Sequence, residues 1–354
     1  MRLPPPDPRT APDPGGAEDA AAALRAGTPG ALEQALDVAR ELGGELPAPG
    51  AGRTGQLWLR LAQLARLDLS LARIVEPHLD ALAILRQAGL EELAGRPATW
   101  GVWAAEAPGH ELVARHGPRG WELTGTKAWC SLAAHLDRAV VTAGTGGGRR
   151  RAFAVDLSHP GVVPGSTEGW CPAGLQDVPT GAVRCTAVPA VPVGADGWYL
   201  ARPGFAWGGI GVAACWYGGA AGTADLLWED AARRVRSGHP PDQLGHAALG
   251  AVDTLLHTAR TALHAAAEQV DAGRAAGDRG AVLALRTRRV VARAAEAVLG
   301  EVAAATGPGP LTGAPEHVRR VSALQVYVRQ EHAQRDAAAL GRALLDGAAG
   351  ERPW

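Results

Sequence analysis

The spacing of apolar residues changes twice along this 354-residue chain, and that order limits the folds open to it. Between about 18 and 95, leucines recur every three or four residues, as from Leu57 to Leu71. This spacing places them on one face of a helix. From about 97 to 203 the apolar segments are short and bounded by glycine and proline, which is typical of strands and turns. From about 206 onward, long helical patterns return.

The succession predicts an α+β fold with an N-terminal helical domain, a central β-domain and a C-terminal helical bundle. We expect residues 1–20 to be disordered, because proline, aspartate and glycine dominate them. The short helical domain would span 21–96, a barrel-like β-domain 97–203 and the four-helix bundle 204–354. Strands and helices do not alternate, as they would in a parallel α/β sheet.

Four long helices are expected in the C-terminal bundle. Their apolar periods place them at about 206–236, 242–273, 279–305 and 316–346. Short turns rich in glycine and proline connect them, which favours antiparallel neighbours.

Composition excludes several classes of protein. A formal net charge of −1 gives no electrostatic footprint for nucleic acid or an anionic membrane. No apolar run of about 18 residues is present, so no membrane span is expected. The four cysteines have no metal-binding spacing, and the N-terminus lacks the apolar stretch of a signal peptide. We therefore expect a cytoplasmic protein with reduced thiols and no metal.

The segment "GWELTGTKAWCSLAA", residues 120–134, contains the only lysine of the chain, Lys127. A sole lysine could be a catalytic amine, for example one that forms a Schiff base. It could equally be a structural residue at the start of a strand. By the two-residue period of a strand, Lys127 would share a face with Trp129.

The same segment resembles the G-hydrophobic-x-x-G-T-K-x-W-I-T-N-A signature of the acyl-CoA dehydrogenase family, with matches at Gly125, Thr126, Lys127 and Trp129. Further segments follow the family's order over about residues 55–345: "VWAAEAPG", "PGVVPGSTEGWCPAGLQDVPTGAVRCTAVPAVPVG", "ARRVRSGHP" and "TGPGPL".

The resemblance implies FAD held between the β-domain and the bundle, with a neighbouring subunit of a homodimer or homotetramer completing the site. Trp129 would lie against the flavin ring and Ser131 near flavin N5. Arg234 would bind the FAD pyrophosphate, where a guanidinium fork suits two phosphate oxygens.

Other cofactor contacts are implied at two places. Trp103 and Ala105 lie where the family's first strand ends beside the flavin, and Ala105 replaces a flavin-contacting threonine. Gly307 and Gly309 would let the backbone approach the adenosine half of a partner's cofactor. The family's "A-G-S-D" is "GHEL" here, so a substrate-side serine has no counterpart.

The catalytic base is the residue that the pattern places least clearly. One family position falls near Gly208, where no acid occurs. The other falls near Glu331, three residues past Val328 on a predicted helical stripe, so its carboxylate could face inward. Glu331 could also pair with Arg335 on a solvated helix face. His332 is the alternative acid or base.

The resemblance implies an FAD-dependent oxidoreductase that removes a proton from an acyl-CoA thioester and transfers a hydride to flavin N5. An alternative is a flavin-dependent monooxygenase or oxidase of the same fold, which has a histidine near the last helix and no catalytic glutamate. A second alternative is a degenerate paralogue that acts as a partner subunit. In each case Lys127 becomes a supporting residue that helps to present Trp129 and Ser131.

Overall fold

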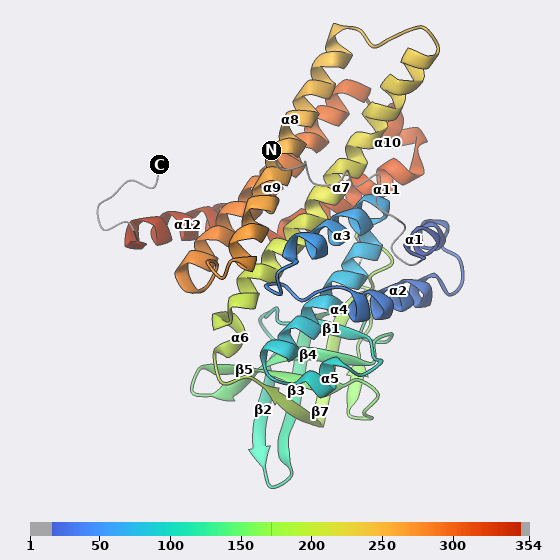
Figure 1. Ribbon diagram of the computed structural model, residues 1–354. Helices are drawn as coiled ribbons and strands as arrows, with labels where there is room; N and C mark the ends of the chain where they lie inside the picture. The colour runs from blue at the N-terminus through green and yellow to red at the C-terminus, as the bar shows by residue number, and fades with distance from the viewer. Residues whose placement is uncertain (1–15, 171, 348–354) are drawn as a thin grey trace.

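A computed structural model describes residues 16–170 and 172–347, with helices at both ends of the chain and strands between them (Figure 1). The first part of the chain forms five helices: α1 (Ala17–Ala26), α2 (Ala31–Glu45), α3 (Thr54–Leu67), α4 (Leu69–Gln87) and α5 (Glu91–Ala94).

The expected disordered segment 1–20 falls mostly on residues 1–15, which lie outside the described residues. Its end is helical, because α1 begins at Ala17. Ala17, Ala20 and Ala21 are buried against neighbouring helices, and this packing stabilises a helix where composition alone indicated disorder.

Seven strands follow: β1 (Trp100–Trp103), β2 (Leu112–Gly117), β3 (Gly120–Ser131), β4 (Arg138–Gly146), β5 (Arg149–Asp156), β6 (Val162–Pro164) and β7 (Thr180–Val193). The order β4-β2-β3-β7-β5 closes on itself, because β5 also pairs with β4. β1 and β6 extend this ring by pairing with β4 and β7. Closure leaves few exposed edges, so the strands form a small barrel.

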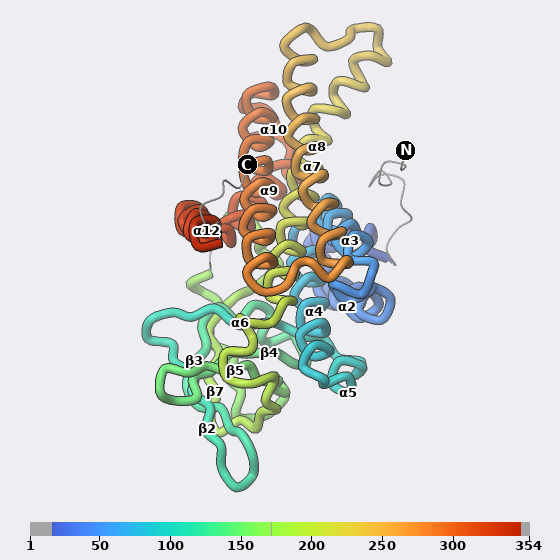
Figure 2. Tube along the Cα trace, turned by 60° about the vertical axis from the view of Figure 1, so that its left-hand side comes forward, coloured from blue at the N-terminus to red at the C-terminus, as the bar shows by residue number. Residues whose placement is uncertain are grey.

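The C-terminal part is a bundle of long helices with shorter ones at its ends (Figures 1 and 2). Its elements are α6 (Trp198–Ala201), α7 (Pro203–Arg236), α8 (Gln243–Asp271), α9 (Gly277–Thr306), α10 (Gly309–Gly313), α11 (Pro315–Tyr327), η1 (Val328–Gln330) and α12 (Gln334–Gly347).

The fourth expected helix, 316–346, is wrong as a single element. α11 ends at Tyr327, and the chain turns through η1 before α12 begins at Gln334. Tyr327 and Val328 are fully buried, whereas α12 has no buried residue. Tertiary packing therefore holds the end of α11 in the core and redirects α12, which lies beside α9 and away from the barrel (Figure 2).

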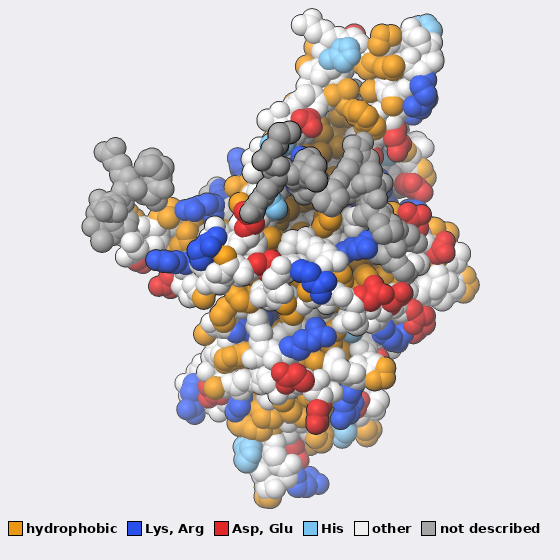
Figure 3. All heavy atoms as spheres, viewed as in Figure 1, with side chains coloured by type: hydrophobic (Ala, Val, Ile, Leu, Met, Phe, Trp, Pro, Cys, Tyr) orange, Lys and Arg blue, Asp and Glu red, His pale blue; other side chains and the backbone are white. Residues whose placement is uncertain are grey.

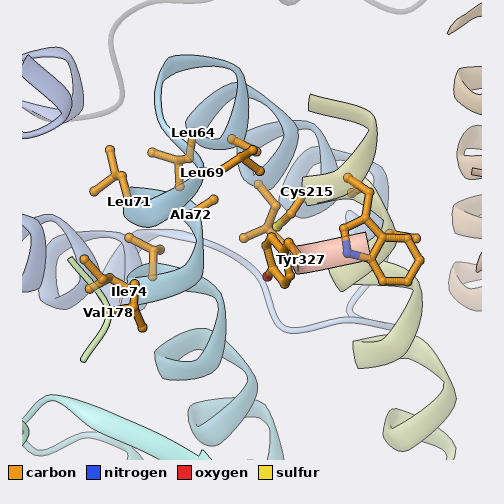
Figure 4. Close-up of a cluster of buried hydrophobic side chains, with 14 of the residues drawn as sticks. Leu64, Leu69, Leu71, Ala72, Ile74, Val178, Cys215 and Tyr327 are labelled. Atoms are coloured by element: carbon orange, nitrogen blue, oxygen red, sulfur yellow. The ribbon is translucent and has the colours of Figure 1, made fainter. Parts of the chain in front are cut away.

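The main core lies where α3 and α4 meet α7 and α11 (Figure 4). Gly218 allows this close approach: a Cβ atom there would lie 2.0 Å from the carbonyl oxygen of Ala62. Below it, Leu82 and Leu85 of α4 pack with Trp100 of β1. α4 thus joins the bundle to the barrel.

The described ranges hold neither a membrane-spanning helix nor a metal-binding cluster. No helix within 16–170 or 172–347 is long and apolar enough to cross a membrane. The same ranges hold no group of three His, Cys, Asp or Glu residues arranged to bind a metal ion.

Candidate functional site

The strand that carries the signature motif contains a β-bulge. β3 pairs with β7 so that Lys127 lies opposite Val183 and Cys130 opposite Gly181, which leaves one extra residue on β3. Lys127 and Ala128 are consequently both buried, while Trp129 is 56% exposed. The prediction that Lys127 and Trp129 share a face is wrong, because the extra residue reverses the alternation.

Trp129 adopts a backbone φ of 58°, in the left-handed region that bulky residues rarely occupy. Such a conformation costs on the order of 1–2 kcal/mol and tends to occur at functional sites. An exposed tryptophan held in this way presents a flat apolar surface to solvent. The site is therefore built around the motif that the sequence singled out.

Lys127 is a structural residue of the barrel interior. Its Nζ donates hydrogen bonds to the carbonyl oxygen of Thr142 at 3.0 Å and to Thr142 Oγ1 at 2.8 Å. Thr142 Oγ1 in turn donates to the carbonyl oxygen of Ala104. Burial lowers the pKa of Lys127 to about 8, with Arg150 acting in the same direction. The amine ties β3 to β4 and, through Thr142, to the end of β1.

Ser131 lies at the end of β3 and is held by two partners, with a third hydrogen bond at the next residue. Its Oγ lies 2.9 Å from Thr180 Oγ1, and its carbonyl oxygen accepts a hydrogen bond from Trp103 Nε1 at 3.2 Å. The adjacent Leu132 N–H donates to the carbonyl oxygen of Pro179. Ser131 as a whole is half-buried.

A second tryptophan supports the exposed ring of Trp129. Trp170, on the loop between β6 and β7, meets it edge to face with ring centroids 6.4 Å apart. The Nε1–H of Trp170 is buried and has no hydrogen-bond acceptor among the residues the structure describes. Trp129 remains largely exposed despite this contact, and a buried indole donor lies beside it. The sequence motif did not reveal Trp170, because the loop has no strand or helix period.

The loop that carries Trp170 is anchored to α11. Gly174 packs so closely that a Cβ atom there would lie 2.1 Å from the backbone nitrogen of Ala323. Arg319 of α11 binds Asp177 of the loop and, at 2.9 Å, the Asp68 carboxylate that caps α4. The bundle thereby fixes the position of one wall of the site.

Trp103 and Ala105 lie behind and beside this wall. Trp103 is 4% exposed, and its indole N–H donates a hydrogen bond to the carbonyl oxygen of Ser131. Trp103 therefore supports the site from within the barrel. Ala105 is exposed, next to Ala104 at the end of β1. Cys130 is buried, and burial raises the pKa of its thiol to about 12, as expected of a packing residue.

The candidate base Glu331 lies beyond the end of a helix and not on its inner stripe. One oxygen of its carboxylate lies 3.2 Å from Arg289 Nη1, and the other accepts the backbone N–H of Ala333 at 2.8 Å. His332 is exposed, and its Nδ1 lies 3.3 Å from Asp336 Oδ1. The Glu331 carboxylate is therefore held by its ion pair with Arg289, whereas the imidazole of His332 is accessible.

Sequence reasoning missed a cluster of charges inside the bundle. Glu76 of α4 is buried beside Tyr327, and burial raises the pKa of its carboxyl to about 7 although Arg73 opposes this. Asp80, one turn further along, pairs with Arg202 at 3.3 Å. Helical spacing could have indicated both acids, because they lie among the apolar residues of α4.

Arg288 of α9 adds a cation to this cluster. It donates to the carbonyl oxygens of Gly209 and Gln330, each at 2.7 Å, and stacks over Trp216. A Cβ atom on the neighbouring Gly208 would lie 2.9 Å from Asp80 Oδ1. The Asp80 carboxyl thus occupies the space that a side chain at position 208 would fill.

The remaining expected cofactor residues lie at the other end of the bundle (Figure 1). Arg234 is exposed near the end of α7, and its Nε lies 3.4 Å from the carbonyl oxygen of His239. It lines a groove of about 870 Å³ that also includes Thr306 and Pro310, which flank Gly307 and Gly309. Hydrophobic side chains gather at this end, over α7 and α8 (Figure 3). The structure therefore brings Arg234 near the glycines but not near Trp129 of the same chain.

Comparison with known proteins identifies the fold. Residues 195–328 match the sequence model of the acyl-CoA dehydrogenase C-terminal domain. The chain also superposes on FMN-bound TdsC from Paenibacillus sp. A11-2 with a TM-score of 0.76 and 17% identity, over 93% of this chain and 96% of TdsC. The chain has the acyl-CoA dehydrogenase fold.

Two further structures with this fold are similar over almost their full lengths. KijD3, in complex with FMN and dTDP-3-amino-2,3,6-trideoxy-4-keto-3-methyl-D-glucose, is 18% identical with a TM-score of 0.71, covering 96% of each chain. Methanesulfinate monooxygenase MsuC from Pseudomonas fluorescens is 17% identical with a TM-score of 0.74, covering 95% of this chain and 97% of MsuC. TdsC is a dibenzothiophene monooxygenase. No curated protein matches the chain in sequence.

Proposed function

We propose that this protein is a flavin-dependent monooxygenase that binds FMN and receives it in reduced form from a separate reductase. In such a reaction one atom of molecular oxygen enters the substrate and the other leaves as water, with two electrons from the reduced flavin. The FMN-bound neighbours and the monooxygenases among them support this choice over FAD and dehydrogenation.

The observation that carries the proposal is the state of the two base positions of this fold. Dehydrogenation of a thioester needs a free carboxylate to remove a proton. Position 208 is glycine, and Glu331 is held by Arg289 and by the N–H of Ala333. Neither position offers an unpaired carboxylate, whereas monooxygenation requires none.

The residues around Trp129 fit a flavin. The exposed ring of Trp129 suits contact with a planar aromatic ring. The Trp170 N–H, which has no acceptor among the described residues, suits an acceptor on the edge of that ring. In this proposal the Ser131 hydroxyl lies at flavin N5. Trp103 and Thr180 orient Ser131.

His332 is the proposed acid or base of the reaction. Its imidazole is accessible, and the Asp336 carboxylate 3.3 Å from Nδ1 would orient the ring. Bound FMN supplies the electrons for oxygen; His332 would take up or release the proton that balances their transfer.

A second copy of the chain would complete the site. Arg234, Gly307 and Gly309 lie at the end of the bundle away from the barrel, whereas Trp129 lies on barrel strand β3. A single flavin could therefore contact both sets only across a homodimer or homotetramer. Arg234 would then bind the phosphate of the partner's flavin.

The proposal is tested with purified protein, FMN, FAD and a reductase. We expect FMN to bind more tightly than FAD, and oxygen consumption to require reduced flavin. Anaerobic addition of an acyl-CoA should leave the flavin absorbance unchanged. Bleaching by acyl-CoA, or a protein that takes up neither flavin, would overturn the proposal.

One observation favours the alternative, an acyl-CoA dehydrogenase. The Asp80 carboxyl lies where a side chain at position 208 would project, and its own side chain is 19% exposed. Burial raises the pKa of Asp80, although Arg202, which pairs with this carboxyl, opposes the shift; as a base, Asp80 would first have to leave that pair. If acyl-CoA bleaches the flavin in the wild type but not in Asp80→Asn, this alternative replaces the monooxygenase.

A further inference from the structure

A second hydroxyl lies directly behind Ser131. β3 and β7 pair Ser131 with Thr180, and their hydroxyl oxygens are 2.9 Å apart. Thr180 Oγ1 also lies 3.0 Å from the carbonyl oxygen of Val178. Thr180 is buried, whereas Ser131 is half-buried at the edge of the site. The three oxygens form a short chain that leads from the site into the protein.

The donor and acceptor chemistry of these groups fixes the direction of the hydrogen bonds between them. A carbonyl oxygen can only accept, so the single hydroxyl hydrogen of Thr180 points to Val178. Thr180 Oγ1 then has only lone pairs for its other neighbour, and Ser131 must donate its own hydrogen to it. The Ser131 oxygen is left with lone pairs alone on the side facing the site.

Two hydrogen bonds hold the backbone around Ser131, so the orientation of its hydroxyl oxygen toward the site is fixed. The carbonyl oxygen of Ser131 accepts the indole N–H of Trp103 at 3.2 Å, and the next N–H, of Leu132, donates to Pro179 at 2.8 Å. These two bonds hold the peptide on either side of the hydroxyl. Ser131 thus presents a fixed acceptor and not a freely rotating hydroxyl.

The inference rests on the proposed flavin site. Nitrogen N5 of an oxidised flavin is a hydrogen-bond acceptor, whereas the reduced ring carries a hydrogen on N5 and donates it. Two acceptors repel each other, while an acceptor and a donor form a bond. We propose that Thr180 is a positioning residue that keeps Ser131 as an acceptor, so that the site binds reduced flavin in preference to oxidised flavin.

This preference suits a protein that takes reduced flavin from solution. A site that bound both forms equally would also be filled by oxidised flavin, which cannot support the reaction. Thr180 would lower that competition without touching the flavin itself. The hydroxyl pair of Ser131 and Thr180 would therefore give the site a preference for reduced flavin that its exposed residues alone do not explain.

The test compares Thr180→Val with Thr180→Ser. Valine has the shape of threonine but no hydroxyl, so it releases the Ser131 hydrogen to turn toward oxidised N5; serine keeps the chain intact. Dissociation constants are measured for oxidised FMN in air and for reduced FMN under nitrogen. One neutral hydrogen bond changes affinity by roughly 2- to 10-fold. We expect the wild-type preference for reduced FMN to fall by up to about tenfold in Thr180→Val and to be retained in Thr180→Ser.

The midpoint potential of the bound flavin reports the same quantity independently of activity. A tenfold loss of preference lowers the potential by about 30 mV for a two-electron couple. A Thr180→Val protein that loses affinity equally for both forms, with an unchanged potential, would show that Thr180 only packs the strand and would overturn the inference.

Two controls separate the possible failures. If Thr180→Val does not fold, Ser131→Ala provides the test, because it should weaken reduced FMN selectively; equal weakening contradicts the inference. A wild-type protein that binds FMN without preference for the reduced form overturns this inference alone. A wild-type protein that binds no flavin overturns the proposed function and this inference with it.

Discussion

Lys127 and Trp129 are two residues apart on β3 and point to opposite sides of it: Lys127 is 2% exposed and Trp129 is 56% exposed. The bulge that separates them sends the only amine of a side chain in this protein into the barrel and the aromatic ring out to the site. Lysine and tryptophan therefore have separate roles, and substitutions should separate them.

Lys127→Met is predicted to change the pH dependence of stability. Burial lowers the pKa of Lys127 from 10.5 to about 8, so between these pH values the unfolded chain holds a proton that the folded protein has released. The free energy of unfolding of the wild type should therefore rise with pH across this window, by on the order of 3 kcal/mol. Lys127→Met should lack this rise in denaturant unfolding at pH 8 to 10.5. Loss of FMN binding in this variant would instead indicate that the amine reaches the site.

Two substitutions of Trp129 should separate binding from folding. Trp129→Ala and Trp129→Gly both remove the aromatic face, and each should weaken FMN binding by roughly tenfold. Glycine tolerates the φ of 58°, so Trp129→Gly should be more stable than Trp129→Ala by about 1 kcal/mol. Fluorescence titration with FMN and thermal unfolding measure the two effects. Unchanged flavin affinity would remove Trp129 from the site.

Glu76 and His78 should make opposite contributions to the pH dependence of stability. Burial raises the pKa of Glu76 from 4.5 to about 7, so its contribution to stability falls as pH rises through this window. Burial lowers the pKa of His78 from 6.5 to about 4, so its contribution falls as pH drops from 6.5 to 4. Each effect is on the order of 3 kcal/mol, and they oppose each other in the wild type.

Single substitutions separate the contributions of Glu76 and His78 to the pH dependence of the free energy of unfolding. With Glu76→Gln, the free energy of unfolding should rise with pH from 4 to 6.5, because His78 alone remains. With His78→Gln it should fall from pH 4.5 to 7; glutamine can still accept the backbone N–H of Trp100 that His78 Nδ1 accepts at 3.2 Å. Urea unfolding at five or more pH values gives both curves. Parallel curves for the two variants would contradict the assignment.

Glu331 and His332 should respond differently to substitution although they are adjacent. Glu331→Gln removes the charge that binds Arg289, and a partly buried pair of this kind contributes on the order of 1–3 kcal/mol. His332→Ala removes an exposed side chain and should cost less than about 0.5 kcal/mol. We expect His332→Ala to lower oxygenation without affecting FMN affinity. A stable, fully active His332→Ala would exclude this residue as acid or base.

Mixed oligomers should show that one flavin site uses two chains. Trp129→Ala and Arg234→Ala should each bind FMN weakly when prepared alone. When the two variants are unfolded and refolded together as a dimer, about a quarter of the sites would combine an intact Trp129 with an intact Arg234. Recovery of that fraction of tight FMN binding is expected. No recovery, with mixed dimers present, would place both residues in the same subunit's site or remove one of them.

Short-range patterns located the elements well where burial and period agree. The helices expected at 206–236, 242–273 and 279–305 correspond to α7, α8 and α9, because each buries apolar residues at helical spacing over much of its length. The helix expected at 316–346 is interrupted because its second half buries nothing. The extra residue in β3 also escaped prediction, since strand pairing sets a bulge and single-strand alternation does not.

The sequence by itself determined the succession of helices, strands and helices, and the motif around Trp129, because apolar period and turn residues are local properties. Only the tertiary structure decided which groups face that motif. Thr180 and Trp170 come from segments about 40 to 50 residues away, and Asp80 fills the space beside Gly208 from another helix. Contacts of this kind depend on strand register and helix packing, which no local pattern encodes.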